Sequence, residues 1–176
     1  TKWFHVPNAG RLDIAINEYV SKGKLLWAGR KISGDHVFVN KLWWNFAQPK
    51  RGDIIVFCTD GIPTLPPKTH YIKRLVGMPS ERISIDPPHI VADGSPVLDH
   101  ELIRRISTRE PGYAGYVLVD RRKPGGKDSL LSSRSDSVLL PEHRYFALGD
   151  NTLNSRDGRY WGPVPESNLV GRAFLV

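Results

Sequence analysis

Residues 71–79, Tyr-Ile-Lys-Arg-Leu-Val-Gly-Met-Pro, place a lysine inside a short apolar run. The run has the length and residue types of a buried strand, and Lys73 directly follows the β-branched Ile72. Burial disfavours the charged form of a lysine, so a Lys73 on an apolar wall loses its proton more readily. A neutral lysine can act as a general base or as a nucleophile. Taken alone, the pair Lys73-Arg74 is more often a solvated strand edge.

A second segment, residues 149–162, makes the chemical interpretation stronger. It reads Gly-Asp-Asn-Thr-Leu-Asn-Ser-Arg-Asp-Gly-Arg-Tyr-Trp-Gly, and its first three residues have turn chemistry that can return Ser155 over the sheet. A simple hairpin or Asx turn would have the same sequence features. Asp157 and Arg159 lie two apart, so in an extended segment they would share a face and could pair. The alternative is an exposed ion pair that contributes less than about 1 kcal/mol.

The composition indicates a β-rich globular domain. The chain has 176 residues, 40% of them hydrophobic and 24% charged, which is enough to bury a substantial core. Fourteen prolines and sixteen glycines favour many turns and short elements over long helices. The single cysteine, Cys58, excludes an internal disulfide framework and any multi-cysteine metal site.

The net charge of +7 suggests an anionic neighbour, either a lipid surface or a nucleic acid, or else a merely basic surface. A basic stripe with interleaved aromatic residues is not evident, so no nucleic-acid partner is expected. The six histidines are dispersed, and we expect neither a metal site nor a cofactor. No apolar run is long enough to span a membrane.

Periodicity and turn residues predict one short helix followed by strands. Apolar residues at helical spacing predict an amphipathic helix within residues 11–28 that ends near Gly23. Residues 59–69 hold three prolines and are expected to form a loop, whereas 87–140 has a weaker pattern of short strands and loops. The predicted strands are 35–41, 52–57, 70–76, 81–85, 144–148 and 169–176.

Four segments, in this order, resemble the bacterial type I signal peptidases, a family of membrane-bound serine–lysine endopeptidases. They are residues 34–41 (GDHVFVNK), 49–57 (PKRGDIIVF), 71–79 (YIKRLVGMP) and 149–165 (GDNTLNSRDGRYWGPVP). Their order and local spacing match the family across about half of the chain. One such segment would be weak support, whereas four in sequence are specific.

The resemblance implies a mainly β fold, with an antiparallel β core and a smaller inserted subdomain, to which the periodicity adds a short N-terminal helix. On this reading residues 34–86 and 141–176 form the catalytic core, and residues 87–140 form the inserted subdomain. Residues 1–33 would be a helical insertion. The implied substrate is an extended pre-protein segment with small residues, Ala-X-Ala-like, before the cleavage point.

The resemblance also assigns roles to individual residues. Lys73 would be the general base that deprotonates a serine hydroxyl, and Ser155 would orient the lysine amine. An extended peptide would dock by adding itself to a strand edge near residues 70–72. The other implied site residues are the structural charge pairs Arg74–Asp150 and Asp157–Arg159, and the substrate-binding residues Tyr71 and Ile72.

The match fails at the nucleophile. In the family a Ser-Met-X-Pro-Thr-like motif lies shortly before the equivalent of Gly34, and here the usual serine position falls on Leu26. Ser21 and Ser33 are nearby, but neither has the flanking residues of the motif. We expect that the catalytic serine and a membrane anchor lie upstream of Thr1, and that residues 1–176 alone do not cleave. The alternative is a relative that has lost its nucleophile and only binds peptides or membranes.

Two smaller departures concern turns. Ser80-Glu81 stands where the family has Gly-Asp, and Gly158 stands where it has a serine. Glu81 keeps the carboxylate, whereas Ser80 lacks the conformational freedom of glycine.

The function expected from the resemblance is that of the extracytoplasmic part of a membrane-bound signal peptidase. A self-cleaving repressor-type Ser–Lys protease is the chemical rival, but it would need a helix-turn-helix domain that the sequence does not show.

Overall fold

The computed structural model describes residues 38–42, 44, 46–122 and 125–175. The predicted helix within 11–28, the whole of segment 1–33, and the positions Ser21, Leu26 and Ser33 lie outside this range. Within it, no helix is long and apolar enough to cross a membrane.

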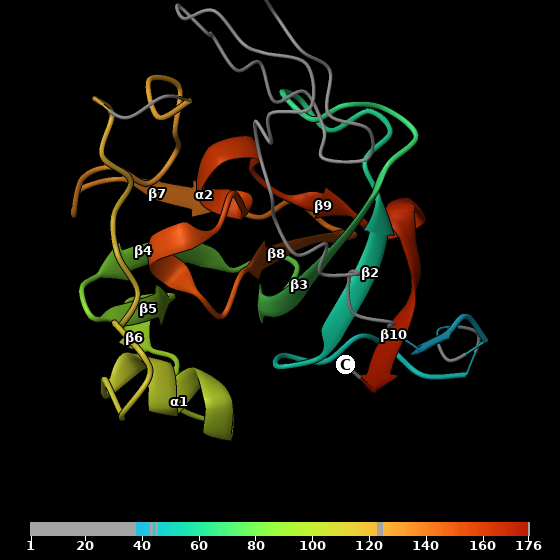
Figure 1. Ribbon diagram of the computed structural model, residues 1–176, viewed down its shortest axis with the longest axis horizontal. Helices are drawn as coiled ribbons and strands as arrows, with labels where there is room; N and C mark the ends of the chain where they lie inside the picture. The colour runs from blue at the N-terminus through green and yellow to red at the C-terminus, as the bar shows by residue number, and fades with distance from the viewer. Residues whose placement is uncertain (1–37, 43, 45, 123–124, 176) are drawn as a thin grey trace, which may run out of the picture. The chain divides into compact units, whose positions relative to one another are not determined.

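In a six-stranded antiparallel sheet, residues 71–77 lie within one strand, and residues 149–162 connect two neighbouring strands. Its strand order is β1-β10-β2-β3-β8-β9, and Figure 1 shows β2 and β10 side by side with β3 and β8 next to them. The strands predicted at 52–57, 70–76 and 144–148 are thereby confirmed, as are the described parts of those predicted at 35–41 and 169–176. The strands are β1 (Phe38–Asn40), β2 (Ile54–Cys58), β3 (His70–Gly77), β8 (Arg144–Leu148), β9 (Val164–Pro165) and β10 (Leu169–Leu175).

Strand β3 is paired unequally on its two sides. It pairs with β2 along 70–74, where Lys73 lies opposite Ile55. On its other side, β8 pairs with β3 only from Arg74 onward, where Arg74 lies opposite Leu148. Within the described residues, the first part of β3 therefore has no ladder partner on the β8 side. This open edge ends at Lys73.

A second, four-stranded sheet has the order β6-β5-β4-β7. Strand β4 confirms the strand predicted at 81–85, and although it falls within 34–86 it pairs with strands from the predicted subdomain 87–140. The division of the chain at residue 87 stays a prediction. The strands are β4 (Arg82–Asp86), β5 (His89–Ala92), β6 (Ser95–Pro96) and β7 (Ser137–Leu139).

The helices are short, and two α-helices lie where none was predicted. Helix α1 (Glu101–Ser107) occupies part of 87–140, for which only strands and loops were expected, and it buries Ile103 and Ile106. Helix α2 (Gly158–Trp161) lies inside the 149–162 segment and is followed by the left-handed Gly162. Two 3-10 turns complete the list, η2 (Thr152–Asn154) and η3 (Glu166–Asn168).

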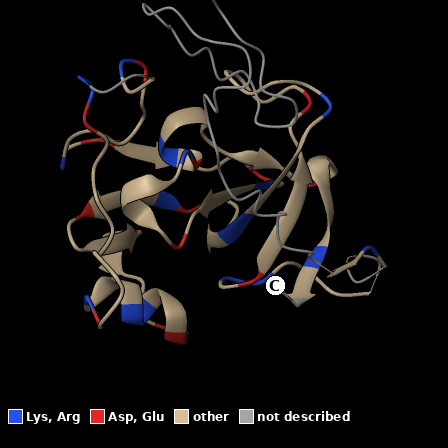
Figure 2. Cartoon of the chain, viewed as in Figure 1, with Lys and Arg blue, Asp and Glu red and all other residues tan. Residues whose placement is uncertain are grey.

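Charged residues are spread over both sheets and their loops, with basic and acidic side chains interspersed (Figure 2). The turn between β3 and β4 shows how one such pair is used. The Glu81 carboxylate accepts hydrogen bonds from the Arg51 guanidinium and from the backbone N–H of Met78. Ser80 adopts the left-handed conformation, with φ of 69°, so the turn keeps a glycine-like shape in spite of the substitution.

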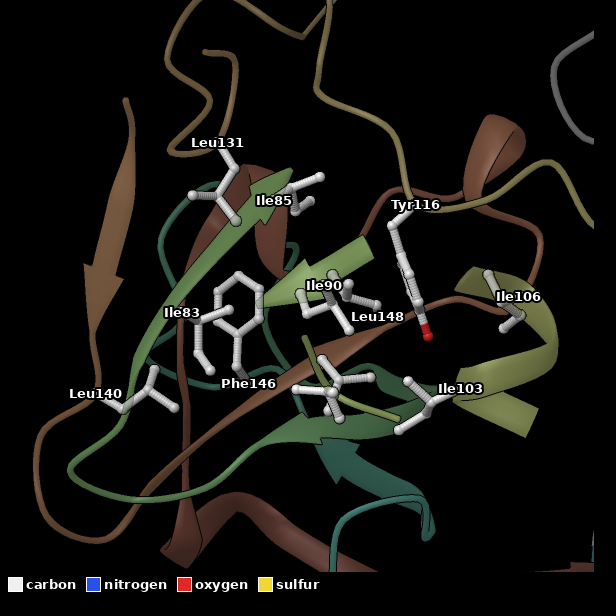
Figure 3. Close-up of a cluster of buried hydrophobic side chains, with 12 residues drawn as sticks. Ile83, Ile85, Ile90, Ile103, Ile106, Tyr116, Leu131, Leu140, Phe146 and Leu148 are labelled. Carbon is white, nitrogen blue, oxygen red and sulfur yellow. The ribbon is translucent and has the colours of Figure 1, made fainter. Parts of the chain in front are cut away.

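One hydrophobic cluster joins the two sheets (Figure 3). Val76 from β3 and Phe146 and Leu148 from β8 are buried in it together with side chains from β4, β5 and α1. This packing holds the C-terminal ends of β3 and β8 in place. The residues that directly follow Leu148 continue from this packed strand end, and they form part of the candidate site. The other members are Ile83, Ile85, Ile90, Val97, Ile103, Ile106, Tyr116, Leu131 and Leu140.

Candidate active site

A cavity of about 270 Å³ lies where β3 meets the turn after β8. Lys73 and Arg74 reach it from β3, and Ser155 reaches it from the segment that follows the 3-10 turn η2. The open edge of β3 ends at this place. Lining residues at least 75 positions apart in the sequence, from Arg74 to Gly149, are thus brought together by the pairing of β3 with β8. The full lining is Ile54, Ile72, Lys73, Arg74, Gly149, Asp150, Asn151, Asn154 and Ser155.

Lys73 and Ser155 converge on the backbone of Gly149. A β-carbon at position 149 would lie 2.2 Å from Ser155 Oγ and 3.7 Å from Lys73 Nζ. Any side chain there would displace the serine hydroxyl, so the site requires glycine at this position. Ser155 Oγ is buried and has no hydrogen-bond partner among the described residues. A buried hydroxyl without a partner is costly, and a nearby amine can relieve that cost after a small movement.

The surroundings of Lys73 favour its neutral form. Burial lowers the pKa of Lys73, because the ammonium ion loses its hydration there. The carboxylates of Asp157 and Asp150 oppose this and raise the pKa, while the positive charge of Arg159 lowers it further. The net direction is downward. The structure therefore supports the property that the sequence suggested for this lysine.

The pair Arg74–Asp150 forms one wall of the cavity. Arg74 Nε and Nη2 donate to the two oxygens of Asp150, each at 2.8 Å. Arg74 Nη1 also donates to the carbonyl oxygen of Gly52 at 2.6 Å. The bidentate geometry fixes Asp150 relative to β3. The predicted pair is present, and it ties the start of the 149–159 turn to the strand that carries Lys73.

The pair Asp157–Arg159 is almost completely buried, with side chains 0% and 3% exposed. Arg159 Nε and Nη2 each donate to Asp157 at 2.8 Å. The pairing was predicted, but the extended conformation assumed for it is wrong. Asp157 caps the N-terminus of α2 by accepting from the Arg159 backbone N–H, so Arg159 lies in a helix. Asp157 also accepts from the backbone N–H of Gly149 at 3.1 Å, which closes the turn.

The two predicted substrate-binding residues are placed differently. Ile72 lines the cavity and is 37% exposed. Tyr71 is not among the cavity residues; its ring packs against Phe57 and Trp161, with centroid distances of 6.2 Å and 5.6 Å. Contact of either residue with a peptide stays a prediction.

Several cavity residues were not singled out from the sequence. Asn151 and Asn154 lie within the 149–162 segment, and their side chains carry polar groups that can bond to a peptide. Ile54 comes from β2, and its only sequence signal was its place in a buried strand. Ser155 is the one serine among the described residues of the lining. Over the described part of the chain, no group of three or more His, Cys, Asp or Glu side chains is arranged to hold a metal ion.

A lysine with a lowered pKa beside a buried serine, at the open edge of an antiparallel sheet, has the features of a peptidase site. Comparison with known proteins gives the family. The family described as signal peptidase, peptidase S26, matches residues 30–176. The chain belongs to this signal peptidase family.

Individual relatives carry the same description. A signal peptidase I of Bacillus caldolyticus is 31% identical over 157 residues, covering 89% of this chain and 76% of the relative. A signal peptidase I of Pseudomonas aeruginosa is 29% identical, covering 81% of this chain and 58% of the relative. A crystal structure of a signal peptidase I from Enterococcus faecalis has a TM-score of 0.48 and 23% identity, covering 72% of this chain and 97% of that one. This chain spans little more than half the length of several of the curated relatives that it matches.

Proposed function

We propose that this chain is the peptidase part of a type I signal peptidase that removes signal peptides from secretory pre-proteins with a Ser/Lys dyad. The observation that carries the proposal is the convergence of Lys73 Nζ and Ser155 Oγ on Gly149 in one cavity. Burial lowers the pKa of the Lys73 amine, which is the property that a lysine general base needs.

In the proposed mechanism Lys73 is the general base and Ser155 is a positioning residue. The neutral amine takes the proton of the nucleophilic serine hydroxyl while the serine oxygen attacks the scissile carbonyl carbon. The resulting ammonium then gives this proton to the leaving amine as the C–N bond breaks. Ser155 Oγ accepts a hydrogen bond from the Lys73 amine and directs its lone pair. Water then hydrolyses the acyl-enzyme, with the same lysine as base.

The nucleophile is proposed to be a serine upstream of Thr1. Ser155 is assigned the orienting role, because its hydroxyl is buried in the turn rather than presented at the strand edge. The position that the family pattern gives to the nucleophile is occupied here by Leu26, which has no nucleophilic atom. We therefore expect no turnover by residues 1–176 alone.

The substrate is proposed to bind along the open edge of β3. Among the described residues, nothing pairs with β3 on this side along 70–73, and the open edge stops where Arg74 pairs with Leu148. An extended pre-protein segment that adds itself there would bring its scissile bond to Lys73. The exposed Ile72 and a cavity of about 270 Å³ suit small apolar side chains near the cleavage point.

The proposed setting is the extracytoplasmic face of the cell membrane, where pre-proteins emerge. An anchor outside this chain would hold the domain at the membrane, and the net charge of +7 would favour an anionic lipid surface. Signal peptides are the proposed partners, and no nucleic-acid partner is proposed. The proposed chemistry uses no cofactor.

Cleavage of a signal-peptide substrate by the full-length protein and by residues 1–176 tests this function. We expect serine-dependent cleavage by the full-length protein and none by residues 1–176. Clear cleavage by residues 1–176 would refute the position assigned to the nucleophile. Peptide binding by a full-length protein that never cleaves would instead identify a binding module that has lost its catalytic serine.

A further inference from the structure

Residues 115–117 belong to the region 87–140, yet their backbone contacts the turn that carries Ser155. Thr152 Oγ1 donates to the carbonyl oxygen of Gly115 at 2.5 Å, in a buried setting. Arg159 Nη1 donates to the carbonyl oxygen of Val117 at 2.9 Å. Both ends of the 152–159 segment are thus bonded to the same short stretch of chain.

The stretch is itself held firmly in place. Tyr116 is 1% exposed and packs within the hydrophobic cluster that joins the two sheets, near Ile90 and Ile106 in Figure 3. Its backbone N–H donates to the carbonyl oxygen of Pro88 at 2.9 Å. Gly115 has φ of 83°, and a β-carbon there would lie 2.5 Å from Pro88, so glycine is required for this path.

The bonds continue from this stretch to the backbone of Ser155. Arg159 Nη2 donates to the carbonyl oxygens of Thr152 at 2.9 Å and of Ser155 at 3.2 Å. Thr152 is 4% exposed and begins the 3-10 turn that leads to Ser155. A displacement of residues 115–117 would therefore be transmitted directly to the residue beside Lys73.

We propose that residues 115–117 act as a brace that positions Ser155 against Lys73, and that Thr152 is the positioning residue whose hydroxyl joins the brace to the turn. The proposal rests on the proposed function for its catalytic meaning, but the brace itself is defined by buried contacts. It gives the region 87–140 a part in shaping the site.

The variant Thr152→Val tests the brace, because it keeps the shape of the side chain and removes the donor to Gly115. Thr152→Ser keeps the hydroxyl and should behave as the original protein. Thr59→Val is the matched control. Thr59 is also buried, at 1% exposure, and its hydroxyl donates to the carbonyl oxygen of Pro66 at 2.6 Å in a loop outside the brace.

The readout is the pKa of Lys73, measured by NMR titration of its labelled side chain in residues 1–176. If the turn loosens, water reaches the amine, the burial effect weakens and the pKa of Lys73 rises. We expect a rise of about half a unit or more in Thr152→Val, which is roughly a threefold smaller neutral fraction at lower pH. Thr152→Ser and Thr59→Val should leave the pKa of Lys73 unchanged.

An unchanged pKa of Lys73 in a folded Thr152→Val protein would overturn the brace. So would an equal rise in Thr59→Val, because general destabilisation would then explain the effect. If Thr152→Val does not fold, Thr152→Ala should give a smaller rise in the pKa of Lys73, since a water can then reach Gly115. The absence of any rise in that variant counts against the proposal.

In the full-length protein, Thr152→Val should lower kcat more than it changes KM. Failure of the proposed function is seen separately, as cleavage that survives Lys73→Ala.

Discussion

Two groups of charged residues in this protein have the same chemistry and opposite surroundings. Asp157 and Arg159 are buried in the turn after β8, where the arginine donates to the aspartate and to three backbone carbonyl oxygens. After the end of α1, Glu110 accepts from Arg104 and Arg105 of that helix, and all three side chains are at least 33% exposed. The buried pair fixes the path of the backbone around Lys73, whereas the exposed group borders a helix. Both groups pair arginine with a carboxylate, so it is burial that distinguishes the charged residues that shape the site from those that are simply exposed to solvent.

The largest effect is expected at the lysine that the buried charges surround. Lys73→Ala in the full-length protein should lower cleavage of a signal-peptide substrate by roughly 10³-fold, since the general base is lost. Lys127→Ala, at an exposed position, should leave the rate unchanged. If cleavage survives in Lys73→Ala, the two lysines do not differ in function and Lys73 is not the general base.

The comparison of the ion pairs can be tested directly by stability. Asp157→Asn should lower the free energy of unfolding by about 3–5 kcal/mol, because it leaves Arg159 buried with an uncompensated charge. Glu110→Gln should cost less than about 1 kcal/mol, because its arginine partners remain hydrated. Urea unfolding of residues 1–176 measures both. Similar losses for the two variants would contradict the role given to burial.

The serine beside Lys73 is expected to act through orientation. Ser155→Ala in the full-length protein should lower kcat roughly 10²-fold with little change in KM, because the amine is no longer held toward the reacting serine. The exposed Ser135 provides the control, and Ser135→Ala should be silent. An equal change in KM would instead point to a part for Ser155 in binding the peptide.

The smallest effect is expected at the turn between β3 and β4. Ser80 has φ of 69°, a conformation that favours glycine, so Ser80→Gly should raise the free energy of unfolding by about 0.5 kcal/mol. The same substitution at the exposed Ser95, in strand β6, should lower it by a similar amount. Thermal unfolding of the two variants gives the signs. A loss at both positions would show that the turn at Ser80 is not strained.

The sequence predicted five of the six strands of the larger sheet, all except the two-residue β9, because their apolar runs are short and lie next to turn residues. It also paired Asp157 with Arg159 correctly, but for the wrong reason. Two residues that are two positions apart share a face in a strand, whereas here Asp157 caps a helix and the Arg159 side chain turns back toward it. The Asp-Gly step at the start of α2 was a capping signal that could have been used.

Helix α1 was missed because it has seven residues and His100 provides no side-chain cap. The brace could not be predicted at all. The hydrogen-bond acceptors in the brace are the backbone carbonyl oxygens of residues 115 and 117. Every residue has a backbone carbonyl, so the sequence gives no signal for such a contact. Contacts of this kind depend on where two distant segments meet, which only the folded chain determines.

The most direct test of the central claim is the titration of Lys73 itself in residues 1–176, because it requires no nucleophile. Labelled lysine side chains report the midpoint by NMR. Burial lowers the pKa of Lys73, so its midpoint should fall clearly below the ordinary lysine value of about 10.4. In the full-length protein the cleavage rate should then rise with pH through that same midpoint, since only the neutral amine accepts a proton. A midpoint at the ordinary value would contradict the account of Lys73 as a general base.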